Sequence, residues 1–211
     1  MEKRIWWTVS VLVILVMLTA CGGKESVSPN KEENKAKTEQ QKNKKKDYVE
    51  IASNENMPLE KKKIKVVLPK ILSDPRISKD DLKLAQAGID EYNNTRQKLP
   101  KNSIGILSYD SYYDVESREL VIAAVLINNR IKTISDIEFE GNMHITIDSK
   151  ARVMPGSFRL EAKNYGSIQP GEGTIVPLSF RVLNYTKDTI TFSKKEIEGS
   201  FYNFKFKELD K

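Results

Sequence analysis

The sequence predicts a mainly β fold, an antiparallel β-sandwich of about seven strands preceded by one amphipathic α-helix. After Pro100, short β-type runs follow one another at roughly 10–15-residue spacing, separated by turn residues and with no helical pattern between them. Residues 119–128 are apolar on both faces, which is typical of a central strand in a packed sheet. A one-sided apolar repeat with helical period precedes Pro100 and predicts the helix.

The helix is expected at about residues 79–97. Ser78 and Asp81 have the spacing of a capping box, in which the two side chains satisfy free N–H groups of the first helical turn. The apolar stripe consists of Leu82, Ala85, Ile89 and Tyr92. Gly88 interrupts the stripe at a helix-propensity cost of ~1 kcal/mol relative to alanine. Leu99 and Pro100 are expected to end the helix.

The other segments are predicted to be strands and connections. Residues 47–63 are polar and indicate irregular chain, whereas residues 64–68 form a short apolar run that ends at Pro69. Later strands are expected at residues 104–109, 119–128, 137–147 with an interruption at Gly141-Asn142, 152–160, 174–183, 189–192 and 199–206. Pro155 and Pro177 favour edge positions or breaks, because proline cannot donate to a ladder.

Charge and reactive side chains narrow the function classes. The formal net charge is +6, but residues 24–46 carry +4 and residues 47–211 carry only +1. The expected folded part is nearly neutral, so nucleic acid is not expected as a partner. One Cys and one His exclude a disulfide framework and multi-His or Cys-cluster metal sites within one chain. No cofactor and no metal are expected.

Residues 1–20 have the organisation of a signal peptide. A charged start precedes an apolar run at residues 5–18, which is too short to span a ~30 Å hydrocarbon core as a helix. The run leads into the four residues Leu18, Thr19, Ala20 and Cys21. This order resembles the lipobox of bacterial lipoproteins. The resemblance implies cleavage before Cys21, a diacylglycerol on its sulfur, and anchoring by acyl chains such as palmitate on the extracytoplasmic face of the cell membrane.

Residues 21–46 are predicted to be a lipidated cysteine followed by a disordered tether. The segment is rich in Lys, Glu and Asn and has too few apolar side chains to offset the entropy of ordering. Its lysine triplet, Lys44 to Lys46, either contacts anionic headgroups and acidic wall polymers or serves solubility alone. Residues 47–211 are expected to form one domain, with strands at about residues 103–207.

Several segments of this domain follow a recognisable order. They are residues 78–81, 99–104, 120–128, 158–160, 168–172 and 178–182. In this order they resemble the SLAP domain of surface and S-layer-accessory proteins from Bacillus-like Gram-positive bacteria. The resemblance implies an Ig-like sandwich that acts as a non-catalytic module of the cell envelope. The chain lacks the Trp that the family carries after its proline turn, and the strands beyond Leu183 have no clear counterpart.

The candidate binding surface lies around one strand–turn. It consists of Tyr109, Tyr112, Tyr113 and Asp114, with Asp110 and Glu116 beside them. Aromatic faces suit sugars and carboxylates suit Ca²⁺, but sandwich tyrosines and a solvated hairpin turn account for the same pattern. The lone His144 is expected on the solvent face of its strand, opposite Met143 and Ile145. Glu138 and Glu140 share a strand face, but neither is expected to have the partner carboxylate in a cleft that a glycosidase pair needs.

The sequence lacks the serine-hydrolase, β-lactamase-type and zinc-protease motifs, so no enzymatic activity is expected. Two function classes stay open. The first is a structural or interaction module that recognises an envelope protein or an acidic wall polymer. The second is a ligand-binding or chaperone-like lipoprotein that serves an exported partner or a small molecule. The first predicts a filled core with an open edge, and the second an aromatic-lined pocket of ~300 Å³ or more.

Overall fold

The computed structural model describes residues 48–51 and 58–210. All described residues belong to one compact unit. In chain order the elements are β1 (Tyr48–Ile51), β2 (Leu59–Lys63), β3 (Lys65–Val67), the 3₁₀ helix η1 (Lys70–Ser73), α1 (Lys79–Tyr92), β4 (Arg96–Pro100), β5 (Ile104–Asp114), β6 (Glu119–Asn128), β7 (Thr133–Ile145), β8 (Arg152–Val153), β9 (Gly156–Leu160), α2 (Ala162–Tyr165), β10 (Glu172–Leu183) and β11 (Ile197–Leu209). The fold is mainly β, as predicted.

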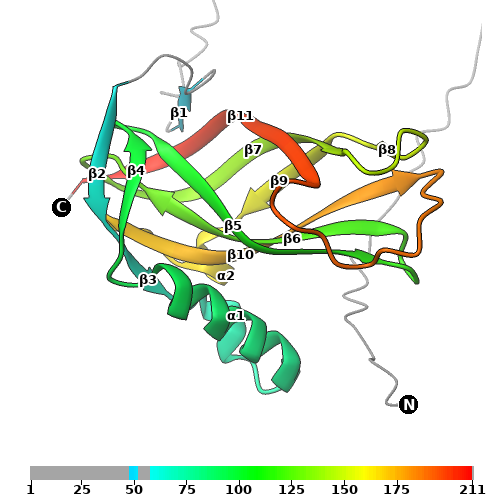
Figure 1. Cartoon of the computed structure of the whole chain (residues 1–211). Coiled ribbons are helices and arrows are strands. Elements are labelled where there is room, and N and C mark those ends of the chain that lie inside the picture. Colours follow the sequence, from blue (N-terminus) through cyan, green and yellow to red (C-terminus); the bar gives the residue numbers. More distant parts are fainter. Residues whose placement is uncertain (1–47, 52–57, 211) are drawn as a thin grey trace, which may run out of the picture. The chain divides into compact units, whose positions relative to one another are not determined.

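The strands form two larger sheets and one separate ribbon (Figure 1). One sheet has the order β1-β11-β7-β9. The other has the order β3-β10-β6-β5, and β8 pairs with the far end of β10. Neighbouring strands run antiparallel except β3 and β10, which are parallel. The ribbon consists of β2 and β4.

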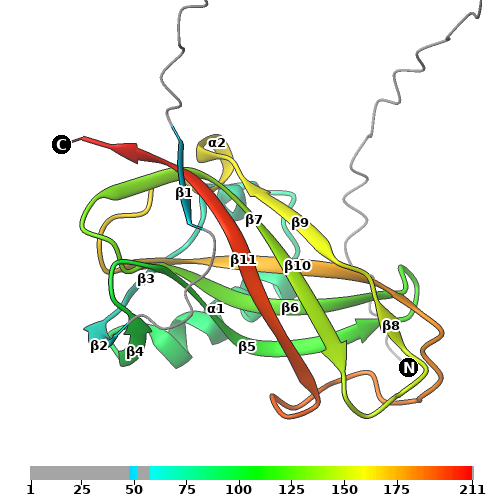
Figure 2. The same ribbon diagram turned by 90° about the horizontal axis from the view of Figure 1, so that it is seen from above.

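The two larger sheets face each other across the main hydrophobic core (Figure 2). Phe139 of β7 stacks on Phe158 of β9 and Phe204 of β11, with ring centroids 5.1 and 5.2 Å apart. Phe180 of β10 meets Phe158 edge-on at 5.1 Å and so joins the two sheets. Phe204 and Phe206 are buried in this core, and Phe201 is partly buried against it.

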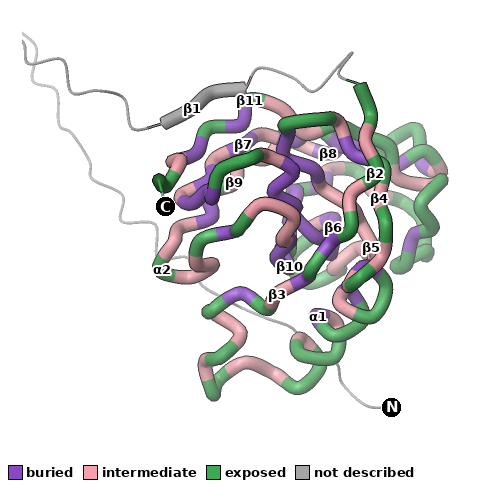
Figure 3. Tube along the Cα trace, turned by 90° about the vertical axis from the view of Figure 1, so that its left-hand side faces the viewer, coloured by how far each residue is buried: buried purple, intermediate pink, exposed green. Residues whose placement is uncertain are grey.

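Strand β6 is buried on both faces, which confirms the prediction of a central strand (Figure 3). Its side chains alternate between the two faces of the sheet. Leu126 points into the core between the sheets, whereas Val125 and Ile127 belong to a second core beneath α1. Ala85 and Tyr92 supply the helix side of this second core. The sheet therefore has a helix on one face and a second sheet on the other.

Helix α1 begins at the predicted capping box. The Oγ of Ser78 accepts a hydrogen bond from the N–H of Asp81 at 3.1 Å and donates one to the Asp81 carboxylate. Three members of the predicted apolar stripe pack on the sheet, namely Ala85, Ile89 and Tyr92. Leu82 differs from the prediction, because its side chain is 40% exposed.

The helix ends at Tyr92, so the predicted end near residue 97 is wrong. Asn94 adopts a left-handed φ of 62°, which turns the chain out of the helix. The Thr95 hydroxyl then donates a hydrogen bond to the carbonyl of Tyr92 at 2.6 Å. Residues 96–100 continue as β4 and pair with β2. Residues 48–51 and 59–63 are strands, which corrects the expectation of irregular chain before residue 64.

One later strand differs from its prediction, and another takes one of the two forms predicted for it. Strand β7 runs without interruption through Gly141 and Asn142. The ladder between β7 and β11 is irregular at other places, with one register shift around Asn203 of β11, which has a φ of 56°, and a second next to Asp136 of β7, which has a φ of 47°. Residues 152–160 form two pieces and not one edge strand, which agrees with the predicted break at Pro155, because β8 pairs with β10 and β9 pairs with β7. The chain therefore passes from one sheet to the other at Met154-Pro155.

The remaining differences concern number and length. Residues 189–192 form no strand but one isolated bridge, between Thr191 and Tyr112. Pro177 lies between the residues of β10 that pair with β3 and those that pair with β8, so the predicted edge position holds locally. Within the described ranges there are eleven strands, more than the seven or so expected.

Candidate functional site

A cavity of about 200 Å³ opens between the two larger sheets, beside β5 and the first half of β11. Apolar and polar groups both line it, and the lining residues are Ile106, Ser108, Ser111, Ile122, Met143, Lys194, Ile197, Gly199 and Phe201. Because β5 is the outermost strand of its sheet, the cavity lies at the side of the sheet pair. It can accommodate one apolar side chain or a small ligand.

The part of β11 that lines this cavity has an open edge. Strand β7 pairs with β11 from residue 197 to residue 209, but β1 pairs with its other side only at residues 204–207. Among the described strands, none pairs with that other side at residues 197–203. The N–H of Thr146 donates to the carbonyl of Glu196 at 2.9 Å. The alternation of an antiparallel ladder therefore directs the main-chain groups of Gly199 and Phe201 toward the open side.

A cation is held at the rim of the cavity. The Nζ of Lys194 lies 2.9 Å from the Oε1 of Glu91 and 3.3 Å from the hydroxyl oxygen of Tyr92. The Tyr92 hydroxyl donates in turn to the carbonyl of Ser108 at 2.8 Å. The hydrogen bond from Lys194 to Glu91 raises the pKa of the lysine, which stays charged. These contacts connect the end of α1 to the segment that leads into β11.

The structure does not bring the three tyrosines of the predicted binding surface to one face of β5. The strand has a bulge at Tyr109, whose ring packs beneath α1 in the second core. The ring of Tyr113 packs against the main core on the opposite face and lies 4.6 Å from the ring of Tyr185. Two of the three rings are therefore used in packing, on different sides of the sheet.

The polar groups of the same segment serve local structure. Burial raises the pKa of Tyr112, and the neighbouring carboxylates of Asp114 and Asp81 raise it further, so this phenol stays protonated at neutral pH. The Oδ1 of Asp114 accepts a hydrogen bond from the N–H of Glu116 at 2.9 Å, which closes the hairpin between β5 and β6. Within residues 48–51 and 58–210, no group of three or more acidic, His or Cys side chains is arranged to hold a metal ion.

The other residues considered from the sequence lie on the outer face of β7. His144 is exposed, as expected, and faces Glu198 across the ladder to β11. Glu138 lies near Arg159, with an oxygen–nitrogen distance of 3.4 Å. This arrangement is an exposed sheet surface, and it gives no cleft in which two carboxylates converge on a substrate.

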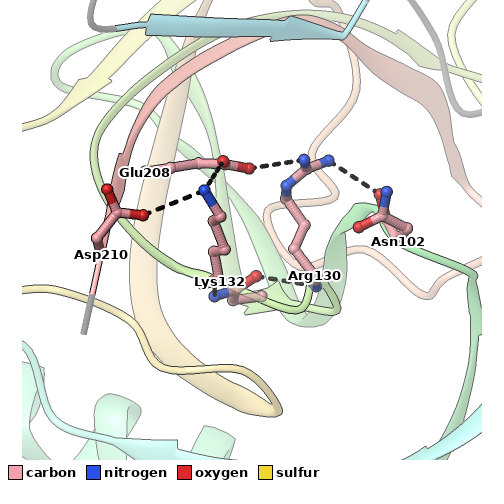
Figure 4. A network of polar contacts seen from close by, with 6 residues as sticks. Asn102, Arg130, Lys132, Glu208 and Asp210 are labelled. Atoms are coloured by element: carbon pink, nitrogen blue, oxygen red, sulfur yellow. Dashed lines mark hydrogen bonds and ion pairs between the residues drawn. The ribbon is translucent and has the colours of Figure 1, made fainter.

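A polar network that was not predicted connects three segments at one end of the sheets (Figure 4). The guanidinium of Arg130 contacts the Oε1 of Glu208 at 2.8 Å and the carbonyl of Asn102 at 3.1 Å. Lys132 lies 3.3 Å from Glu208 and 3.2 Å from Asp210. The network fastens the end of β11 to the β6–β7 turn and to the turn after β4. It acts as a structural clamp.

The predicted lipobox, with Leu18, Thr19, Ala20 and Cys21, lies outside the described residues, and so does the predicted tether. Within the described part of the chain, no helix has the length and apolar character needed to cross a bilayer. The lipid anchor therefore stays a prediction.

The sequence did not indicate the cavity or the open edge, because the cavity depends on how distant strands pack together and the edge on how far β1 pairs along β11. A signal was available in Ile197, Gly199 and Phe201, whose alternation shows an inward face that includes a glycine. Comparison of the chain with protein-family models, with curated proteins and with solved structures gives no match.

Proposed function

We propose that this chain is a membrane-anchored extracytoplasmic lipoprotein and acts as a non-catalytic interaction module of the cell envelope. In this proposal, Cys21 carries the lipid and residues 22–46 connect this anchor to the domain. The domain is a β-sandwich of the Ig-like, SLAP-related kind. The mainly β fold with two facing sheets is compatible with this assignment.

One observation carries the proposed mode of binding. The cavity of about 200 Å³ is lined by Ile197, Gly199 and Phe201, and these residues belong to the stretch of β11 that is open among the described strands. An extended segment of a partner can therefore pair with this edge and place one apolar side chain in the cavity. Main-chain hydrogen bonds supply affinity in such strand addition, and the pocket supplies specificity.

The lysine at the rim of the cavity favours a partner that carries a negative charge. Lys194 is 61% exposed at its side chain while it contacts Glu91, so it can accept a second anionic group from outside. A partner segment that carries an acidic residue near its apolar anchor fits this rim. The proposed partner is thus an extended, partly apolar segment of another envelope protein.

The ligand-carrier alternative rests on the same cavity. Its volume is below the ~300 Å³ expected for a carrier of drug-sized molecules. Phe201 is the one aromatic residue among its lining residues. A single anchoring side chain suits these dimensions better than a small-molecule cargo.

Two measurements test the proposal in its two parts. For the anchor, cells that express the full chain are labelled with a palmitate analogue, and the Cys21→Ala variant is expected to lose the label. For the edge, a photo-crosslinking residue replaces Ser200 on β11 or, as a control, the exposed Ser157 on β9. The Ser200 probe is expected to give one discrete adduct in intact envelopes, and the Ser157 probe is not.

A cavity-filling variant links the adduct to the pocket. Ser111→Leu occupies the cavity and is expected to remove the adduct, whereas Ser157→Leu leaves it unchanged. An adduct that persists with Ser111→Leu contradicts binding through the cavity. Recovery of bulk membrane proteins at background level from the Ser200 probe contradicts the interaction role itself.

A further inference from the structure

The ribbon of β2 and β4 places like charges directly opposite each other. Lys61 pairs with Lys98 and Lys63 pairs with Arg96 in the antiparallel register. All four residues are exposed, and alternation along both strands puts their side chains on the same face. Cβ atoms of directly opposed residues are about 4.5–5.5 Å apart, so each pair destabilises the ribbon. The stability of the fold therefore does not explain why these like charges are placed opposite each other.

None of these four cations has an ion-pair partner among the described residues. Several basic side chains elsewhere on the domain do have such partners. Lys65 contacts Glu172 at 2.9 Å, Lys207 contacts Asp136 at 3.2 Å, and Lys132 contacts both Glu208 and Asp210. Glu60, the acidic residue of β2, falls on the opposite face of the ribbon, together with Leu99. The four charges are therefore available to an external anion.

The ribbon is fixed to the domain at both ends. At one end, the carbonyl of Pro100 accepts hydrogen bonds from the Nδ2 of Asn129 at 2.7 Å and from the Oγ of Ser103 at 2.6 Å. At the other end, the N–H of Ile64 donates to the carbonyl of Thr95 at 2.9 Å. Leu99 is 2% exposed and packs into the second core. The four cations thus sit on a rigid support, unlike the lysines of a flexible chain.

An apolar end adjoins the charged face. Leu59 lies directly opposite Pro100, and its side chain is 65% exposed. It occupies the same face as Lys61 and Lys63, because the three alternate along β2. A rigid face with several cations and one protruding apolar side chain matches a bilayer surface, where phosphates take the charges and the apolar side chain enters the headgroup boundary. A soluble polyanion offers no apolar region in which the side chain of Leu59 can be buried.

We propose that this face, formed by Leu59, Lys61, Lys63, Arg96 and Lys98, binds a surface of anionic phospholipids. The inference rests on the proposed location at the outer face of the cell membrane. It orients the domain with the ribbon toward the bilayer. It also assigns membrane contact to the folded domain, in addition to any contact that the predicted tether makes.

The test uses the chain from residue 21 to residue 211 with Cys21→Ser, which retains every described element. Its binding to vesicles of phosphatidylglycerol and phosphatidylcholine is measured by co-sedimentation at 0.1 M salt, with pure phosphatidylcholine vesicles as the reference. The starting chain is expected to bind the anionic vesicles and not the neutral ones. The double variant Lys61→Glu, Lys63→Glu is expected to bind at least tenfold more weakly, since each basic residue near such a surface contributes about fivefold.

The same double variant is also tested for stability, which is expected to stay equal or rise while vesicle binding falls. It places a carboxylate opposite Lys98 and another opposite Arg96, so the domain is expected to unfold at an equal or higher urea concentration. Loss of binding therefore cannot come from unfolding. Lys61→Gln with Lys63→Gln repeats the measurement with neutral side chains. The matched control is Lys150→Glu with Lys187→Glu, two exposed lysines elsewhere, and it is expected to change binding less than twofold.

Three outcomes overturn the proposal. The first is unchanged vesicle binding by the ribbon variants together with loss of binding when Lys44, Lys45 and Lys46 are replaced by Gln. The second is no binding of the starting chain to anionic vesicles. The third is unchanged vesicle binding by Leu59→Ser together with equally tight binding to soluble polyphosphate, which identifies a wall-type polymer as the ligand. The lipid anchor is tested separately by palmitate labelling. A chain that is not labelled with palmitate but binds vesicles through the ribbon contradicts only the lipoprotein assignment.

Discussion

The Nη2 of Arg130 lies 2.8 Å from the Oε1 of Glu208, and this pair joins the β6–β7 turn to the last strand of the domain. The side chains are 12% and 20% exposed. The guanidinium also lies over the ring of Phe206, 4.9 Å from its centroid. An arginine that is this well buried depends on its carboxylate, because an unpaired charge in such a place is strongly unfavourable.

The first prediction follows from this pair. Glu208→Gln is expected to lower the free energy of unfolding at pH 7 by about 1–2 kcal/mol. The hydrogen bond from Arg130 holds the pKa of Glu208 below its usual range, with Lys132 contributing to the same shift. Stability from such a lowered pKa is present above the pKa of the unfolded chain, about 4.3, and is lost as the pH falls through the folded value.

Urea unfolding at pH 7 and at pH 3 measures this effect. The difference between the original chain and Glu208→Gln is expected to shrink at the lower pH. Glu198→Gln, an exposed carboxylate on the same strand, is the control and is expected to change stability by less than about 0.5 kcal/mol at either pH. A difference that stays constant between the two pH values contradicts the charge-based account.

The second prediction concerns Gly88, which helix propensity alone treats as a flaw. A Cβ at this position would lie 2.5 Å from the Cε1 of Tyr109 and 2.8 Å from the Cδ1 of Ile175. Gly88→Ala is therefore expected to destabilise the domain by about 1–3 kcal/mol through overpacking, although alanine is the better helix former. The glycine lets α1 approach the sheet closely.

The neighbouring Ala87 provides the comparison, because it is exposed on the same helix. Ala87→Gly changes propensity alone and is expected to cost about 1 kcal/mol. Both substitutions are measured by thermal and urea unfolding. If Gly88→Ala stabilises the domain by about as much as Ala87→Gly destabilises it, the close helix–sheet contact does not constrain the position.

The third prediction concerns the bulge in β11. Asn203 has a φ of 56°, a region that branched side chains rarely adopt. Asn203→Gly is expected to leave the midpoint of urea unfolding nearly unchanged, whereas Asn203→Val is expected to lose about 1–2 kcal/mol. The same replacement at Ser200, Ser200→Val, lies in regular strand and should be tolerated. Equal tolerance of valine at both positions contradicts the bulge geometry.

The sequence predicted the parts of the fold that depend on local patterns. The continuous apolar run of β6 gave its bounds, Glu119–Asn128, and its two-sided burial. Ser78 gave the start of α1. The end of the helix was missed because Asn93 and Asn94 continue a polar helical pattern, while pairing with β2, distant in sequence, makes residues 96–100 a strand. Propensity cannot report such a partner.

The surfaces were less predictable than the core. The tyrosines around Asp114 are close in sequence, but the bulge at Tyr109 and the two-sided packing of β5 send their rings to different places. The lysines of residues 61–63 looked like a mobile charged run until the register placed Lys61 against Lys98. Pairings between distant strands create both the open edge and the charged face, and a single sequence does not display them.

The fourth prediction concerns two tyrosines, Tyr109 and Tyr92, that differ in whether their hydroxyl group makes a hydrogen bond. The hydroxyl of Tyr109 is buried and has no hydrogen-bond partner among the residues that the structure describes, whereas that of Tyr92 donates to the carbonyl of Ser108 at 2.8 Å. Burial raises the pKa of both phenols, so both are neutral at pH 7. Tyr109→Phe removes an unpaired polar group and is expected to leave stability unchanged or raise it by up to about 1 kcal/mol.

Tyr92→Phe is the matched substitution and is expected to have the opposite effect. It removes one made hydrogen bond and leaves a carbonyl without its donor, at a cost of about 1 kcal/mol. It also removes one contact of Lys194, so the rim of the cavity should loosen. Urea unfolding of the two variants and of the double variant measures both effects. If Tyr109→Phe destabilises the domain as much as Tyr92→Phe does, the Tyr109 hydroxyl has a partner in solution, and the second core is less dry beneath α1 than its packing implies.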